Sequence, residues 1–242
     1  MVYLKNKVTR SWEFNEDFPK IPAVSEEEKV VLRDRLVPTL ASAAPPIRQQ
    51  LLPLIGKVLH YDFPERWPSY MDITLQLLNS NDIQSVFAGV QCLLSLCRVY
   101  RFKSNDDKRS ELDRVTQATF PIILTIGTKL VDENSTDAGE MLKMIVKTYK
   151  HAIYSEMSEH LREESSIVAW ATLFIKIVQK EPPAESMVED LDDREIHPWW
   201  KTKKWAYANL NRLFVRYVAT LLCCFRESGT DLLCADTAIP RA

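Results

Sequence analysis

Apolar residues recur along most of the chain at steps of three and four, which is the spacing of amphipathic helices. Within residues 46–61 the apolar positions that share one face are Ile47, Leu51, Ile55, Val58 and Leu59. The helix predicted there ends at Asp62-Phe63-Pro64, because a proline disfavours helical dihedrals in the residue before it. A new helix is predicted from Trp67 onward, so this stretch consists of two helices joined by a short proline-marked corner.

The same scheme of helix, short corner and helix repeats along the rest of the chain. The predicted helices cover residues 3–12, 26–43, 46–61, 67–78, 83–102, 109–131, 136–154, 161–180 and 198–217. Ser25 with Glu28 three residues later has the pattern of a capping box, and Asp82 is placed to cap another helix. Pro121 and Gly127 are expected to interrupt the helix in which they lie.

The predicted helices form pairs, and no stretch has a convincing strand pattern. The pairs are 26–43 with 46–61, 67–78 with 83–102, 109–131 with 136–154, and 161–180 with 198–217. They recur about every 40 to 50 residues, the period of HEAT and armadillo repeats. A helix with one apolar face must bury that face, so each pair is expected to stack on its neighbours. The sequence therefore predicts an all-α fold, a HEAT-repeat (armadillo-like) α-solenoid of antiparallel helix pairs.

Composition agrees with this fold and excludes several functions. Hydrophobic residues make up 46% and charged residues 26% of the 242 residues, as in an ordinary soluble globular protein. The low count of 5 glycines argues against an all-β fold and against phosphate-cradling loops. A net charge of −2 gives no reason to expect nucleic-acid or anionic-membrane binding. No apolar run is expected to be long enough to cross a bilayer, and the N-terminus does not resemble a signal peptide.

The residue types that carry catalysis or bind metals are scattered. Cys92 and Cys97 lie in an apolar helical pattern, and the 5 cysteines include no CxxC pair, so we interpret these two as buried thiols of a reducing compartment. The histidines are far apart in the sequence: His60, His151, His160 and His197. HExxH, GxSxG and Walker motifs are absent from the sequence. The sequence therefore predicts no enzyme, no metal site and no cofactor.

A cluster of tryptophans and lysines opens the last predicted helix. Trp199, Trp200 and Trp205 are interleaved with three basic residues, Lys201, Lys203 and Lys204. Aromatic and basic residues in this arrangement can bind RNA or an acidic protein. The preferred interpretation is that the tryptophans anchor the start of the helix in the core while the lysines face water.

Three segments resemble the N-terminal repeats of the importin-β superfamily of nuclear transport receptors. They are YLKNKVTRSW (3–12) followed by SEEEKVVLRDRLVPTL (25–40), IRQQLLPLIGKVLHYDFPERWPSYM (47–71) with its D-F-P-x-x-W-P corner, and HPWWKTKKWAYANLNRLFVRY (197–217). The third is similar to the branch that contains importin seven, importin eight and their fungal counterparts. The resemblance implies that residues 1–217 are importin-β-type N-terminal HEAT repeats that lack the family's first helix. Residues 218–242 do not resemble the family's continuation and are expected to be disordered or an artefact of gene prediction.

The resemblance also implies a function and its partners. Receptors of this family bind the GTPase Ran, protein cargo with basic signals and the Phe-Gly repeats of nucleoporins, and they move between cytoplasm and nucleus. In import, Ran-GTP and cargo favour different curvatures of the solenoid, so that binding of one lowers the affinity for the other. Two alternatives remain open. One is an export receptor, in which Ran-GTP strengthens cargo binding, and the other is a HEAT-repeat scaffold unrelated to transport.

Two groups of residues are candidates for partner binding. In the family, the second helices of the early repeats line the concave face and contact Ran, and Arg48, Gln49 and Lys57 lie off the apolar stripe of such a helix. These three face Ran or are ordinary surface. The second group is an acidic run in the predicted loop 181–197, made of Glu189, Asp190, Asp192, Asp193 and Glu195. This run either contacts basic cargo or is a solvated loop.

Overall fold

The computed structural model describes residues 2–14, 16–17, 21–101 and 106–227, and this part of the chain is helical without a strand. Its longer helices are α1 (Val2–Ser11), α2 (Glu26–Ser42), α3 (Pro45–Asp62), α4 (Ser69–Leu78), α5 (Ile83–Tyr100), α6 (Asp106–Leu130), α7 (Thr136–Ala152), α9 (Glu164–Gln179) and α11 (Pro198–Glu227). The short ones are α8 (Glu159–Arg162), α10 (Leu191–Ile196) and the 3₁₀ turn η1 (Ala184–Ser186). The predicted all-α class is confirmed.

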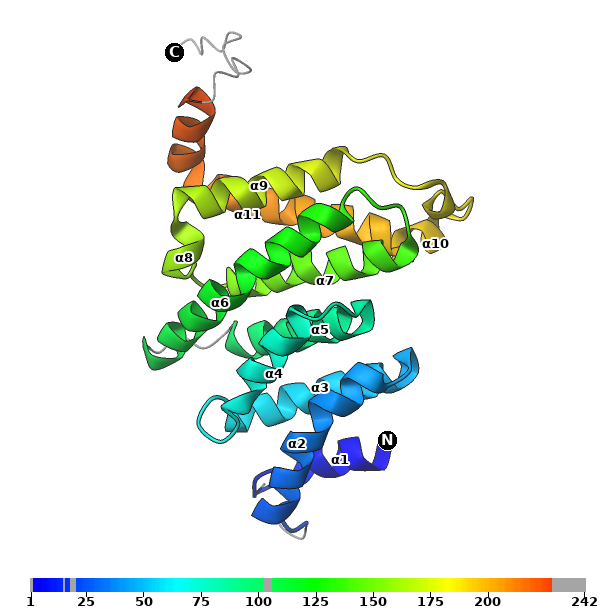
Figure 1. Cartoon of the computed structure of the whole chain (residues 1–242), viewed down its shortest axis with the longest axis vertical. Helices are drawn as coiled ribbons and strands as arrows, with labels where there is room; N and C mark the ends of the chain where they lie inside the picture. The colour runs from blue at the N-terminus through cyan, green and yellow to red at the C-terminus, as the bar shows by residue number, and fades with distance from the viewer. Residues whose placement is uncertain (1, 15, 18–20, 102–105, 228–242) are drawn as a thin grey trace.

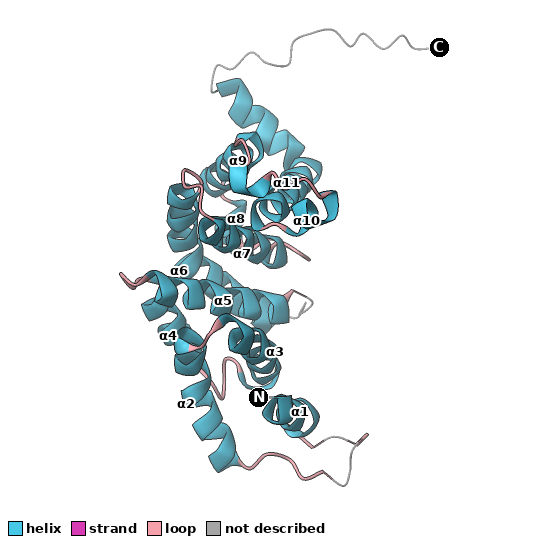
Figure 2. Ribbon diagram, turned by 90° about the vertical axis from the view of Figure 1, so that its right-hand side faces the viewer, coloured by secondary structure: helices cyan, strands magenta, loops and turns pink. Residues whose placement is uncertain are grey.

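The helices stack along the long axis of the molecule, from α1 near one end to α11 near the other (Figures 1 and 2). Helices α1, α3, α5, α7 and α11 pack consecutively against one another, and we call them the B layer. Helices α2, α4, α6 and α9 each pack on the B-layer helix that follows them in the chain, and we call them the A layer. The four predicted helix pairs are therefore confirmed as antiparallel pairs of a two-layered solenoid.

The predicted caps are present at two helix starts. Ser25 and Glu28 form a reciprocal capping box, in which each backbone N–H donates to the side chain of the other residue, at 3.2 and 3.3 Å. The carboxylate of Asp82 accepts from the backbone N–H of Ser85 at 2.9 Å. Both caps satisfy donors that the first turn of a helix leaves without an intrahelical partner.

Two predictions of irregular backbone are wrong. Helix α6 runs through Pro121 and Gly127 without interruption. Pro121 is exposed on the outer side of α6, and Gly127 lies so close to α9 that an added Cβ would be 3.0 Å from Leu173, so packing on α9 supports the continuous helix. The predicted loop 181–197 contains η1 and α10, because Asp190 accepts from the backbone N–H of Asp192 and caps a short helix there.

The last helix contains one irregular residue. Tyr217 in α11 has φ −132° and ψ 27°, outside helical values, and the helix resumes beyond it as far as Glu227. This break coincides with the predicted end of the family-like segment at residue 217. The division of the chain there and the nature of residues 218–242 remain predictions, and residues 228–242 lie outside the described part.

Helix α5 lies at the centre of the stack, between α3 and α7. Contrary to the expectation from the sequence, it is long and apolar enough to span a membrane by length and composition, with a mean hydropathy of 1.3 over 18 residues. However, 67% of that stretch is buried inside the protein. Its hydrophobicity is accounted for by neighbours on several sides, as for the core helix of a helical stack.

We expect Cys92 and Cys97 of α5 to resist alkylation in the native protein. Both thiols are fully buried, and burial raises the pKa of each to about 12, so the reactive thiolate is scarce at pH 8. Peptide mass spectrometry after iodoacetamide treatment should find both cysteines unmodified in buffer and modified in concentrated urea. Rapid modification of either one in buffer would contradict its placement in the core.

Candidate functional site

Arg48 is buried, and the expectation that it is a surface position is wrong. Its Nε donates to the carbonyl of Ala43 at 2.7 Å, and its Nη2 donates to the carbonyl of Ala41 and to the Gln84 side chain, both at 3.1 Å. The guanidinium also lies over the ring of Phe87. Arg48 therefore satisfies carbonyls that the end of α2 leaves open and ties α3 to α5. Its Nε and Nη2 donors are used inside the protein.

Gln49 and Lys57 lie at the surface, but the structure does not bring them together with Arg48. Gln49 is exposed, and Lys57 is half-buried about two turns further along α3. The ammonium of Lys57 is 3.3 Å from the hydroxyl of Tyr61 and 4.9 Å from the centre of its ring. Of the three predicted residues, Lys57 has the clearest local geometry.

Lys57 borders a polar hollow between the end of α1 and the end of α3. The hollow has a volume of about 350 Å³, and its walls include Thr9, Arg10, Glu13, Lys57 and Tyr61. Basic and acidic groups from two B-layer helices and the segment after α1 face this space. It is suited to contacts with a polar protein surface rather than to enclosing an apolar ligand.

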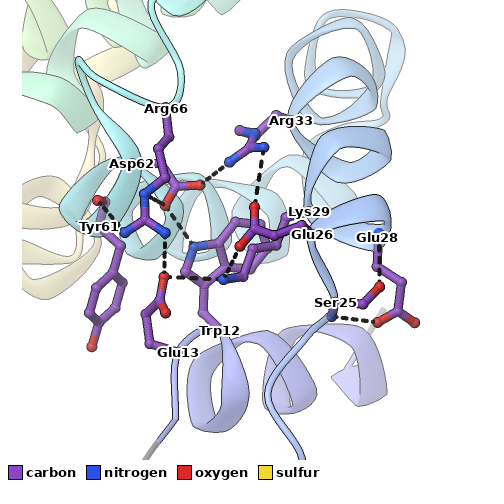
Figure 3. A network of polar contacts seen from close by, with 10 residues as sticks. All are labelled: Trp12, Glu13, Ser25, Glu26, Glu28, Lys29, Arg33, Tyr61, Asp62 and Arg66. Carbon is purple, nitrogen blue, oxygen red and sulfur yellow. Dashed lines mark hydrogen bonds and ion pairs between the residues drawn. The ribbon is translucent and has the colours of Figure 1, made fainter.

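A buried carboxylate at the centre of a polar network contacts Trp12, one of the residues that line the hollow (Figure 3). Asp62 at the end of α3 is fully buried and accepts from the indole Nε1 of Trp12 at 3.1 Å and from Nη1 of Arg33 at 2.7 Å. The Nε of Arg66 lies 3.6 Å from the same carboxylate. One side chain thus joins the segment after α1, helix α2 and the corner after α3.

Ion pairs extend this network to the surface. The ammonium of Lys29 is 3.2 Å from Glu13 and 2.9 Å from Glu26, and Arg66 is 2.8 Å from Glu13. Burial acts to lower the pKa of Lys29, but hydrogen bonds to the two carboxylates outweigh it and the pKa is raised. Glu13 therefore stands between two cations at the rim of the hollow. The sequence alone places Asp62 in a corner and indicates no partner for it.

The acidic run is gathered on one short element. Glu189, Asp190, Asp192 and Asp193 are exposed at the start of α10, which lies beside the N-terminal end of α11 (Figure 1). Glu195 pairs with Lys204 at 3.1 Å. Among the residues that the structure describes, no group of His, Cys, Asp or Glu is arranged to hold a metal ion. The run presents carboxylates to solvent, a geometry open to a basic partner.

Trp199 anchors the start of α11, as the preferred interpretation of the tryptophan and lysine cluster predicts. Its ring is 2% exposed and its Nε1 donates to the carbonyl of Ser135 at 3.1 Å. The ring lies on Gly139 of α7 so closely that a Cβ there would be 3.0 Å away. Thr202 also donates to the carbonyl of Gly139, at 2.9 Å, so α7 and α11 are held at close range.

Comparisons with known proteins agree with the architecture. Residues 1–42 match the model of the importin-beta N-terminal domain. The chain is 33% identical over 237 residues to "Nonsense-mediated mRNA decay protein 5" of Saccharomyces cerevisiae, and 28% identical over 220 residues to importin-8 of Homo sapiens. These alignments cover 91% and 89% of this chain and 22% and 21% of the relatives, so the chain spans about a fifth of their length.

A solved structure shares the fold. The exportin Cse1 in its cargo-free, cytoplasmic state matches with a TM-score of 0.73 and 19% identity, over 93% of this chain and 25% of that chain. At this level of identity the match shows the helical solenoid fold alone.

Proposed function

The chain belongs to the importin-β superfamily, and from this premise we propose that it acts in nuclear transport, binding Ran in its GTP form, protein cargo with basic signals and Phe-Gly nucleoporins. Members of the superfamily bind Ran and cargo, and such receptors with their solenoid fold are not enzymes. The observation that carries the proposal is the importin-beta N-terminal domain at residues 1–42, followed by stacked helix pairs to α11. A receptor of this kind would be found in both cytoplasm and nucleus.

The proposed Ran contact is the polar hollow bordered by Lys57, together with Gln49 about two turns nearer the start of α3. Lys57, Arg10 and Glu13 bring charges of both signs to one surface, and the buried carboxylate of Asp62 holds the elements behind it. The proposed contact for basic cargo is formed by Glu189 and Asp190, just before α10, and by Asp192 and Asp193 in its first turn. Carboxylates exposed together in one place attract a lysine- and arginine-rich peptide at moderate salt.

Import is the direction we propose, because the relative named importin-8 aligns with most of this chain. A relative named exportin-2, of Drosophila melanogaster, is 23% identical over 202 residues, which keeps export as the alternative. The two directions differ in the sign of the coupling between Ran-GTP and cargo. Ran-GTP would release a bound basic peptide from an import receptor and would strengthen its binding to an export receptor.

The test is binding of the purified chain to Ran loaded with GTP and, separately, with GDP. We expect selective binding to the GTP form. Lys57→Ala is expected to weaken it about fivefold, since truncation of a contributing interface residue costs about 1 kcal/mol. The matched control is Lys129→Ala, an exposed lysine on α6 in the A layer, which should bind Ran as the unchanged chain does.

Two results would contradict the proposal. Equal affinity for both nucleotide forms would remove the nucleotide switch on which transport depends. Equal weakening by the Lys57 and Lys129 substitutions would mean that the hollow is not the Ran contact.

A lysine- and arginine-rich peptide labelled with fluorescein then reports the direction of transport, through its release or retention when Ran-GTP is added. Its binding should weaken in the Asp192→Asn, Asp193→Asn double variant.

A further inference from the structure

A third charged surface, formed by B-layer helices, lies away from both the Lys57 hollow and the acidic run. Helices α5, α7 and α11 contribute basic residues to it, and we call these the basic patch: Arg98, Arg101, Lys143, Lys147, Lys150, Lys201, Arg212 and Arg216. Helix α7 packs against both α5 and α11, and the three helices lie next to one another in the stack (Figure 1). Of these residues, only the lysine at the start of α11 stands out in the sequence, as part of the tryptophan and lysine cluster.

The spacing of these residues puts them on matching faces of their helices. Lys143, Lys147 and Lys150 follow one another at steps of four and three, so they share one face of α7. Lys201, Arg212 and Arg216 share a face of α11 with Trp205, whose ring lies 3.7 Å beneath the ammonium of Lys150. Contacts of this kind order the lysine stems and leave the charges at the surface.

The cations influence one another across the three helices. Burial lowers the pKa of Lys147, and repulsion by Lys143, Arg98 and Lys201 lowers it further, against a weaker attraction from Glu140. For Lys150, burial acts together with Arg212 and Arg101 in lowering the pKa. Cations on α5 and α11 thus lower the pKa of lysines on α7. These charges therefore form one continuous region of positive potential rather than isolated surface charges.

His151 lies within the same region of positive potential and does not add to it at neutral pH. Burial lowers its pKa to about 4, assisted by repulsion from Arg98, Arg101, Lys150 and Lys147. The imidazole is therefore uncharged at pH 7. The positive charge of the patch comes from arginines and lysines.

Two of the arginines are held in place by the end of α7. Nη1 of Arg216 donates to the carbonyl of Ile153 at 3.0 Å, and Arg212 donates to the carbonyl of Tyr154. These carbonyls lie at and just beyond the C-terminal end of the helix, where cations are favoured. The arginines are thus fixed before any partner arrives, which lowers the entropic cost of binding.

We propose that the basic patch binds an extended acidic peptide segment of a partner protein. Lys143 to Lys150 covers about 10 Å along α7, and three neighbouring helices cover about 20 Å across the stack. An extended peptide of about six residues spans that width, so glutamates or aspartates along it would meet cations from α5, α7 and α11 in turn. This is the opposite chemistry to the basic signals proposed for α10, and it does not depend on Ran.

The chemistry of the patch favours a peptide over a single-stranded nucleic acid. Proteins that bind single strands combine basic residues with aromatic faces on which bases stack. Two aromatic rings lie within the patch, and cations already cover both. Lys150 and Lys147 lie 3.7 and 5.4 Å from the centre of the Trp205 ring, and Arg212 and Arg101 lie 5.2 and 5.8 Å from the centre of the Tyr154 ring. Carboxylates need only the charges, which the patch supplies from three helices.

The experiment measures fluorescence anisotropy of a fluorescein-labelled peptide of eight glutamates with the full 242-residue chain at low salt. We expect saturable binding that weakens as salt is added, because exposed charges are screened. The variant Arg98→Gln, Lys147→Gln, Lys150→Gln should bind the peptide about tenfold more weakly. The matched control Arg35→Gln, Lys129→Gln, Lys176→Gln removes the same charge from exposed A-layer positions and should change affinity less than twofold.

Equal losses in the two triple variants would overturn the proposal, because the effect would then be one of net charge. Stronger binding of an eight-nucleotide single-stranded RNA than of the peptide would overturn it in favour of a nucleic-acid surface. If the patch variant does not fold, exposed Arg98 is replaced alone, and the single Arg98→Gln change should weaken peptide binding about two- to fivefold while Arg35→Gln does not.

Discussion

Replacement of Asp62 by asparagine is expected to lower the free energy of unfolding by about 3–5 kcal/mol, the usual cost of removing one partner from a buried ion pair. Asp62 is fully buried, and its carboxylate accepts from the guanidinium of Arg33 at 2.7 Å and from the indole of Trp12 at 3.1 Å. Asparagine keeps one acceptor oxygen but leaves the Arg33 charge, which is 8% exposed, with the more distant carboxylate of Glu26 at 3.9 Å in place of its 2.7 Å partner. Urea unfolding followed by circular dichroism measures the loss.

The matched control is Asp34→Asn, an exposed aspartate one residue from Arg33 on α2. It should change stability by less than about 0.5 kcal/mol. Replacing both Asp62 and Arg33 with uncharged residues, as Asp62→Asn with Arg33→Met, should cost less than the sum of the two single changes, because the double variant leaves no buried charge unpaired. If Asp62→Asn is as stable as Asp34→Asn, the buried network does not hold these helices.

Hydrogen exchange should show that the Asp62→Asn effect is local. In a solenoid each repeat contacts its neighbours alone, so the amides of α1, α2 and α3 are expected to lose protection while those of α9 and α11 keep it. Because the Lys57 hollow lies against the same network, the variant should also weaken Ran-GTP binding in the assay proposed above. A loss of protection spread evenly to α11 would mean that the stack unfolds as one unit.

The helix positions could be predicted from the sequence, because they depend on local rules that each segment satisfies by itself. Periodic apolar residues, the capping box at Ser25 and the cap at Asp82 fix where α2 and α5 begin. The uninterrupted course of α6 through Pro121 and Gly127 could not be predicted, because contacts with neighbouring helices outweigh the local preference of single residues.

Side-chain partners far apart in the sequence were the part that sequence reasoning missed. Arg48 looks like a polar surface position by periodicity, but the carbonyls at the end of α2 and the Gln84 side chain surround it. Asp62 bonds to Trp12, which is 50 positions away in the sequence, and to Arg33, which is 29 positions away. The available signal was an aspartate next to Phe63 in the corner that also contains Trp67, since a carboxylate among buried aromatic residues needs a counter-ion.

Replacement of Trp199 by alanine is expected to cost about 3–5 kcal/mol, as for the removal of other large buried aromatic side chains. The ring fills the space over Gly139, where the lack of a side chain lets α7 and α11 approach closely. Its loss opens a cavity that the backbone of α7 cannot close and removes the hydrogen bond to the carbonyl of Ser135. Urea unfolding of the variant and hydrogen exchange in α7 and α11 measure the effect.

Tyr207→Ala serves as the control for Trp199→Ala, because Tyr207 lies on the same helix but is 67% exposed. It should cost less than about 0.5 kcal/mol. A Trp199→Ala variant as stable as Tyr207→Ala would mean that the Trp199 ring does not hold α11 in place.

If Trp199 does hold α11 in place, its loss should also weaken binding of the glutamate peptide, because α11 contributes Lys201, Arg212 and Arg216 to the basic patch. The peptide assay with Trp199→Ala therefore tests whether the packing of Trp199 positions the cations of the basic patch, although Trp199 is not part of the patch.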